Sequence, residues 1–214
     1  MAGKKLVDTW KMKRWYSVVA PKFFNEAEVA QVPALDDEHI LNRIIEIPLK
    51  EITHDLSHMY TNVRLRVSEI KGKTAYTKFV GHSVSREYLR TMVRRHRDAL
   101  TAIVPVISKD GIEFSVKAMA ITNTNCSGTQ KTALRNLLME EVKKRAKGTD
   151  FGEFINDAIY GKVALEIGRK LVKIAPVRRV EIYKTQLKED FDVEEKQELP
   201  EDAKHEAGSE ENAA

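Results

Sequence analysis

The chain of 214 residues contains a single cysteine, Cys126, and no long apolar run. One cysteine excludes an internal disulfide bond and an all-cysteine zinc site within the chain. No stretch approaches the roughly 20 apolar residues that a membrane-spanning helix needs. The first residues also lack the apolar segment of a secretion signal. These absences predict a protein of the reducing cytosol that has no membrane partner.

Acidic residues are concentrated at the C-terminus. Residues 187–214 contain eleven Asp and Glu against three Lys, whereas residues 1–186 carry a net charge of +12. An acidic segment with few aromatic residues buries too little apolar surface to offset the entropy of ordering, so residues 188–214 are expected to be a disordered tail. The basic body favours a polyanionic partner. The alternative is a basic surface that only keeps the protein in solution.

Aromatic and basic residues are interleaved near the start of the chain. Residues 1–25 contain both tryptophans, and we expect them to form an extended basic arm. Its cations would contact phosphates, and its rings would stack on unpaired bases. The alternative is that the rings pack into the domain and only the lysines are exposed. The predicted nucleic-acid contacts of the arm are Lys4, Lys5, Lys11, Lys13, Arg14, Trp15 and Lys22.

The hydrophobic pattern of residues 26–187 predicts one α+β domain. Apolar residues alternate with polar ones over 45–49, 63–67, 74–80, 104–121 and 177–187, which predicts strands and hairpins. Helical spacing is found over about 86–100, 131–146 and from 149 or 161 to 174. Strands and helices without regular alternation predict a curled, mostly antiparallel sheet with helices packed on it.

A run of arginines in the first predicted helix is the most informative feature. Ser85 is a suitable N-cap for this helix, and its apolar stripe would be Leu89, Val93, His96 and Leu100. The neighbouring arginines are Arg86, Arg90, Arg94, Arg95 and Arg97.

The acids beside these arginines are only Glu87 and Asp98. Like charges one helical turn apart cost a few tenths of a kcal/mol per pair, so we expect an external anion to neutralise them. Guanidinium groups suit bidentate phosphate contacts. The alternative is a helix that tolerates the repulsion. Four further arginines are expected to extend the same surface: Arg64, Arg66, Arg178 and Arg179.

No motif gives positive support for an enzyme. His54 and His58 have the spacing of a zinc-protease helix, but Thr53 and Ser57 favour a turn there. The sequence Gly72-Lys73-Thr74 copies the end of a phosphate-binding loop without its glycine-rich beginning, so a hairpin turn is the better interpretation. We therefore predict no catalytic residue, metal site, cofactor or small-molecule substrate.

Seven segments carry a resemblance to a known family. They are residues 4–8, 14–25, 63–67, 72–73, 89–95, 161–162 and 177–180, and the longest reads RWYSVVAPKFFN. In this order they resemble the eS-one (S-three-a) family of small-subunit ribosomal proteins of archaea and eukaryotes. The resemblance implies a barrel-like sheet with flanking helices. The short, uncharged stretch 122–129 makes the chain similar to archaeal members rather than to the longer eukaryotic ones.

The resemblance also implies a function. Family members lie on the platform of the small ribosomal subunit, near the 3′ end of its rRNA and the mRNA exit. We therefore expect a cytoplasmic, non-catalytic constituent of the ribosome, whose partners are small-subunit rRNA and neighbouring small-subunit proteins. The alternative is a protein–protein adaptor or chaperone-like module outside the ribosome, whose basic body is masked by its own acidic tail.

Overall fold

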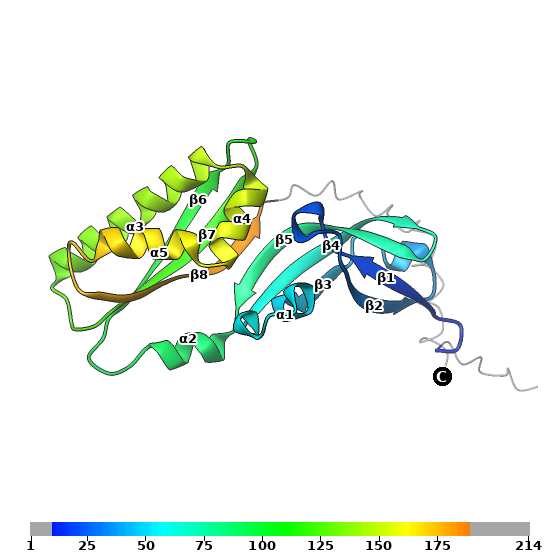
Figure 1. Ribbon diagram of the computed structural model, residues 1–214, viewed down its shortest axis with the longest axis horizontal. Coiled ribbons are helices and arrows are strands. Elements are labelled where there is room, and N and C mark those ends of the chain that lie inside the picture. Colours follow the sequence, from blue (N-terminus) through cyan, green and yellow to red (C-terminus); the bar gives the residue numbers. More distant parts are fainter. Residues whose placement is uncertain (1–9, 189–214) are drawn as a thin grey trace, which may run out of the picture.

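The computed structural model describes residues 10–188, which form one branched sheet with helices on one side of one half (Figure 1). Lys4, Lys5 and the acidic segment from residue 189 onward lie outside the described residues. Within residues 10–188, no helix has the length and apolar character needed to cross a membrane.

The first half of the sheet contains the strands of the N-terminal part of the chain. They are β1 (Arg14–Val19), β2 (Glu28–Ala34), β3 (Ile44–Pro48), β4 (Thr61–Lys71) and β5 (Thr74–Val84). The long hairpin of β4 and β5 turns at Gly72, whose φ of 63° favours glycine. The predicted hairpin turn is therefore confirmed. Short helical segments connect the strands: η1 (Lys22–Phe24), η2 (Asp37–His39), α1 (Leu49–Thr53) and η3 (Leu56–His58).

The second half is a three-stranded antiparallel sheet with helices on one face (Figure 1). Its strands are β6 (Ala99–Ile107), β7 (Glu113–Thr122) and β8 (Val177–Leu187), and its helices are α3 (Gly128–Gly148), α4 (Phe151–Ile159) and α5 (Lys162–Leu171). Burial alternates strictly along β6, with Leu100, Ala102 and Val104 buried beneath the helices. Ile103 and Ile107 point to the opposite face and are exposed.

Strand β5 joins the two halves. Its first residues, from Thr74 to Tyr76, pair in parallel with β1, and Gly81, His82 and Ser83 pair antiparallel with β8. Its other edge pairs with β4. The glycine at position 81 is required, because a Cβ there would lie 2.3 Å from the carbonyl oxygen of Thr185.

The sheet is mixed and open, so the expected barrel is wrong while the α+β class is confirmed. Within residues 10–188 the strand order is β2-β1-β5-β8-β7-β6, and β4 and β3 form a branch from β5. The physical reason is the divided edge of β5: two strands share it, which splits the sheet into branches instead of closing it. All pairs except β1 with β5 are antiparallel, as expected.

A chain of aromatic contacts runs through the core that the two halves share. The ring of Phe79 on β5 lies 6.0 Å from that of Phe151 on α4, and Phe151 lies 5.2 Å from Phe114 on β7. Edge-on and tilted ring pairs of this kind add to the free energy gained from burial. The aromatic chain therefore fixes the helical layer against β5 as well as against its own sheet.

Much of the expected N-terminal arm is part of the sheet. Residues 14–19 form β1, with Tyr16 and Val18 only 2% and 0% exposed. The ring of Phe23 packs 5.7 Å from that of Phe79. The physical reason is the alternation of Tyr16, Val18 and Ala20, which gives the strand one apolar face. An extended arm ending at residue 25 is therefore wrong for residues 14–25.

The helix expected over 86–100 is much shorter. Helix α2 spans Arg86–Met92, Val93 is extended, and His96 adopts a left-handed φ of 61° in a turn. Leu100 is buried as a residue of β6, where it pairs with Ala120. The expected helix does not reach residue 100 because Leu100 belongs to the alternating pattern of β6. As part of this strand, Leu100 buries more apolar surface than it would at the end of an isolated helix. His96 is exposed, so it is not a core residue.

The other helices follow the expected hydrophobic pattern. The predicted helix over 131–146 is α3, which begins earlier because Ser127 and Gln130 form a capping box. The last predicted helix is divided into α4 and α5 at Tyr160 and Gly161.

Candidate nucleic-acid interface

Helix α2 is fixed at its first turn. The Ser85 hydroxyl accepts a hydrogen bond from the Tyr88 N–H at 3.4 Å, which confirms the predicted N-cap. The Ser85 N–H donates to the carbonyl oxygen of Tyr60 at 2.8 Å. The rings of Tyr60 and Tyr88 are stacked with 4.6 Å between their centroids. This anchoring leaves Arg86 and Arg90 on the exposed side of the helix.

Asp98 anchors the other end of the segment that follows α2. Its carboxylate accepts a hydrogen bond from the Cys126 N–H at 2.8 Å and forms an ion pair of 2.8 Å with Lys131 on α3. Its own N–H donates to the Thr122 hydroxyl at 2.9 Å. The hydrogen bonds from Lys131 and from the Cys126 N–H lower the pKa of Asp98. This acid therefore neutralises Lys131 and is not a partner of the arginines beside it.

The five arginines between these anchors form the α2–β6 arginine cluster. Within residues 10–188, none of their side chains forms a hydrogen bond, an ion pair or a cation–π contact with another residue. One atom, Nη1 of Arg97, is buried and lacks a hydrogen-bond partner among the described residues. The other four side chains are exposed. The α2–β6 arginine cluster consists of Arg86, Arg90, Arg94, Arg95 and Arg97.

Arg178 and Arg179, at the beginning of β8, lie at the same end of the sheet. Residue Ala99 pairs with Ile121, which in turn pairs with Arg179 on β8. The Arg179 guanidinium lies 5.7 Å from the ring centroid of Tyr88 on α2, and its Nε donates to the carboxylate of Glu181. Arg178 is exposed. The structure therefore brings this pair next to α2, although Arg179 already has an acidic partner.

Arg64 and Arg66 lie on β4. Arg64 pairs with Gly81, and Gly81 pairs with Gln186 near the end of β8. Gln186 is seven residues along the strand from Arg179, which corresponds to about 23 Å at ~3.3 Å per residue. Arg64 also forms an ion pair of 3.5 Å with Glu46. Arg64 is thus separated from Arg179 along the sheet, but it lies only three residues along β4 from Thr61, which pairs with Val84 beside the start of α2.

The cations of the N-terminal region form a third group at the β1 end of the sheet. Lys13 Nζ lies 4.2 Å from the ring centroid of Trp10, and Trp15 is 57% exposed. Lys11 and Arg14 are also exposed, and so is Lys22, which lies in η1 beyond the other end of β1. Both alternatives given for the rings are thus found in part, because Trp15 is exposed whereas Tyr16 and Phe24 are buried.

Sequence reasoning missed the two tyrosines that hold this region together. Tyr60 precedes β4 and Tyr88 lies on α2, and no spacing pattern connects them. Their stacking depends on where β4 begins and β5 ends, because Thr61 pairs with Val84. This register could not be read from either segment alone.

The two histidines with zinc-protease spacing do not share a helix. His54 ends α1 with a left-handed φ of 56°, and the Asp55 side chain accepts a hydrogen bond from the Ser57 N–H. His58 packs edge-on against the ring of Tyr160. Over residues 10–188, no group of three or more His, Cys, Asp or Glu side chains is placed to hold a metal ion.

Comparison with known proteins gives a consistent family. Residues 1–190 match the model of the Ribosomal S3Ae family. The chain is 39% identical over 188 residues to a protein of Sulfurisphaera tokodaii named small ribosomal subunit protein eS1, covering 87% of this chain and 97% of that protein. Proteins of the same name from Saccharolobus solfataricus and Saccharolobus islandicus are 37% and 36% identical over 185 residues, covering 86% of this chain and 89% of each relative. The chain therefore belongs to the ribosomal S3Ae family.

Proposed function

We propose that this chain is a non-catalytic structural protein of the small ribosomal subunit and binds rRNA through the α2–β6 arginine cluster. One observation carries the rRNA contact: the five guanidinium groups of the cluster have no acidic partner within residues 10–188. The names of the relatives support the ribosomal setting.

The cluster is suited to a phosphate backbone by its anchoring. Ser85 fixes the start of α2, and Asp98 fixes the connection to β6. The main chain that carries the arginines therefore needs little further ordering when RNA binds. Guanidinium groups pair with phosphate oxygens through two parallel hydrogen bonds, and these contacts report the shape of the RNA rather than its sequence.

The other basic groups would act as secondary rRNA contacts. The exposed ring of Trp15 offers a stacking surface for an unpaired base, beside Lys11, Lys13 and Arg14. Lys22, Arg64, Arg66 and Arg178 would contribute phosphate contacts at separate points, and so would Lys4 and Lys5. A protein with basic groups at several separated places can join different rRNA segments, which fits the proposed position on the platform near the rRNA 3′ end and the mRNA exit.

The test is the salt dependence of binding to purified small-subunit rRNA, measured by filter binding. If about six phosphates are contacted, log K falls with log salt with a slope of about −4 to −5. An affinity that does not change with salt would contradict the proposal. The same titration with a chain lacking residues 189–214 separates the adaptor alternative, because a self-masking tail predicts strong RNA binding only after its removal.

A further inference from the structure

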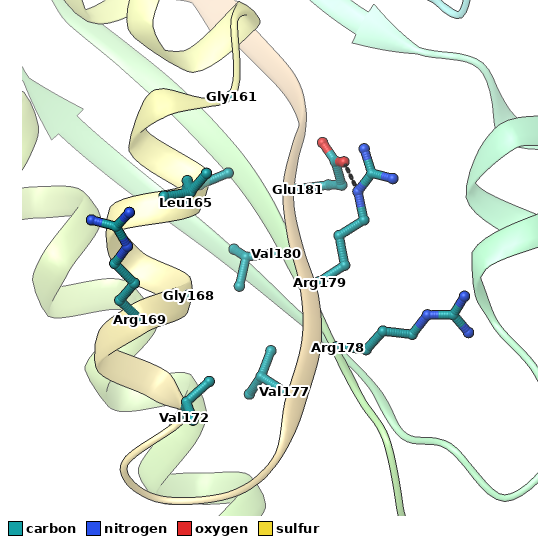
Figure 2. A pocket seen from close by; sticks show the side chains of 11 residues that line it. Gly161, Leu165, Gly168, Arg169, Val172, Val177, Arg178, Arg179, Val180 and Glu181 are labelled. Atoms are coloured by element: carbon teal, nitrogen blue, oxygen red, sulfur yellow. Dashed lines mark hydrogen bonds and ion pairs between the residues drawn. The ribbon is translucent and has the colours of Figure 1, made fainter.

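A groove of about 430 Å³ runs between α5 and the first half of β8. Figure 2 shows Leu165 and Val172 on the α5 side and Val177 and Val180 on the β8 side, all bordering the same space. Leu165 and Val172 are aliphatic but are 56% and 55% exposed. Part of the apolar surface at this border is therefore left uncovered within the described chain.

The groove lies along a free strand edge. Strand β8 pairs with β7 along nearly its whole length, but β5 pairs only with Lys184, Thr185 and Gln186 on the other edge. The Ile182 carbonyl oxygen on that edge is occupied by a hydrogen bond from His82 Nε2 at 3.1 Å. Among the residues that the structure describes, no strand pairs with this edge over residues 177–181, a length of about 17 Å at ~3.3 Å per residue.

The main chain at this edge is suited to an added strand. Alternate residues of an antiparallel strand direct their N–H and C=O groups to the same edge. The main-chain groups of Val180, two residues before Ile182, therefore face the open side. The Cβ position of Gly168 on α5 is 3.7 Å from a Val180 methyl group, so the glycine keeps the helix close to the strand without covering its edge.

The rim of the groove is positively charged. Arg169 borders it on the α5 side and Arg178 on the β8 side (Figure 2), and neither forms an ion pair within residues 10–188. The lining acid, Glu181, is already bonded to Arg179. An occupant that complements this groove has acidic side chains for the rim, apolar side chains for Leu165 and Val172, and an extended backbone for the edge.

We propose that this groove binds an extended acidic segment of a partner protein, which adds a strand to the free edge of β8. Addition of a strand gives affinity through main-chain hydrogen bonds and specificity through alternate side chains. A segment of four or five residues would span the free edge. This inference goes beyond rRNA binding and does not depend on the α2–β6 arginine cluster, because the groove lies between α5 and β8; it shares only Arg178 with the proposed secondary rRNA contacts.

The probe is a fluorescein-labelled nonapeptide in which glutamate and valine alternate, titrated with the full-length chain by fluorescence anisotropy. We expect saturable binding and slower hydrogen exchange at the amides of residues 177–181. The same peptide with N-methyl groups on alternate residues cannot complete the ladder and is expected not to bind. A peptide with lysine in place of glutamate tests the charge of the rim and is also expected not to bind.

Protein variants locate the site. Leu165→Glu and Arg178→Glu are each expected to raise the Kd for the peptide about tenfold, equivalent to ~1.4 kcal/mol. The matched control is Ile103→Glu, because Ile103 is 60% exposed on the sheet face away from the helices. It should leave the Kd unchanged. If Leu165→Glu does not fold, as judged by circular dichroism, Val172→Glu replaces it.

Four results would overturn this proposal. The first is that the peptide does not bind. The second is that Ile103→Glu weakens peptide binding whereas Leu165→Glu does not. The third is that a uridine decanucleotide, but not the peptide, protects the amides of residues 177–181 from hydrogen exchange. The fourth is peptide binding that occurs only after residues 189–214 are removed, which would make the chain's own tail the occupant. None of these results affects the salt-dependent contact with rRNA at the α2–β6 arginine cluster.

Discussion

The ring of His82 lies with its Nδ1 atom 2.6 Å from the hydroxyl oxygen of Thr185, where β5 meets β8. Its Nε2 atom is 3.1 Å from the Ile182 carbonyl oxygen, so Nε2–H donates there and Nδ1 accepts from the Thr185 hydroxyl. The His82 N–H donates to the same hydroxyl oxygen at 3.2 Å. One buried neutral side chain therefore ties the two halves of the sheet together.

This arrangement predicts a specific loss of stability in acid. Burial lowers the pKa of His82 from 6.5 to about 4. The unfolded chain therefore takes up this proton as pH falls through 6.5, while the folded chain stays neutral until about pH 4. The stability that His82 provides is fully present above pH 6.5 and falls between pH 6.5 and 4, by up to about 3 kcal/mol.

Urea unfolding at several pH values between 7.5 and 4 measures this loss. The variant His82→Gln is expected to be less stable at neutral pH and to lose most of the pH dependence in this window. The control is His54→Gln, because His54 is exposed at the end of α1 and should leave the profile unchanged. An identical profile for His82→Gln and the unmodified chain would contradict the assignment.

The double variant Arg90→Glu with Arg94→Glu is expected to abolish assembly into small subunits without unfolding the domain. Both side chains are exposed and unpartnered within the described residues, so the free energy of unfolding should change by less than about 0.5 kcal/mol. Co-sedimentation with subunits on sucrose gradients measures assembly, and thermal unfolding measures stability.

The matched control for this charge reversal is Lys143→Glu with Lys147→Glu on α3. These lysines are exposed, have the same separation in sequence, and form no ion pair within residues 10–188. The control changes the net charge by the same amount and should still co-sediment. Equal loss in both variants would show that total charge, rather than the α2–β6 arginine cluster, determines assembly.

The variant Gly81→Ala is expected to destabilise the fold by about 2–3 kcal/mol. The added Cβ would lie 2.3 Å from the Thr185 carbonyl oxygen, which is main chain and can move only if β5 and β8 separate. Urea unfolding measures the change. Gly128→Ala serves as the control, because a Cβ there meets no atom within 4 Å and should cost nothing.

The periodicity of single segments predicted much of the fold. Alternation identified β4, β5 and β8, and helical spacing identified α3. The same reasoning failed where two periods overlapped: Leu89, Val93 and Leu100 fit a helical stripe, yet Leu100 belongs to the alternating run of β6. The alternation of Tyr16 and Val18 is typical of a strand. The many cations around these two residues led instead to the prediction of an extended basic arm.

The placement of the basic groups could not be predicted, because it depends on pairing between distant segments. Arg64 and Arg179 were assigned to one surface from their charge alone. The ladders of β5 with β4 and β8 place them toward opposite ends of β8. One edge of β5 is divided between β1 and β8. This division depends on the assembled sheet, so it could not be predicted from the residue pattern of any single segment.

Strand β5 also has a mechanical consequence. Within residues 10–188 its ladder to β8 contains three residue pairs, whereas β7 and β8 pair over nearly their whole length. A torque applied to one half while the other is held would concentrate its shear stress at Gly81, His82 and Ser83. The two halves should therefore rotate relative to each other as rigid bodies about this short ladder. The ring contact between Phe79 and Phe151 lies at the pivot of this rotation.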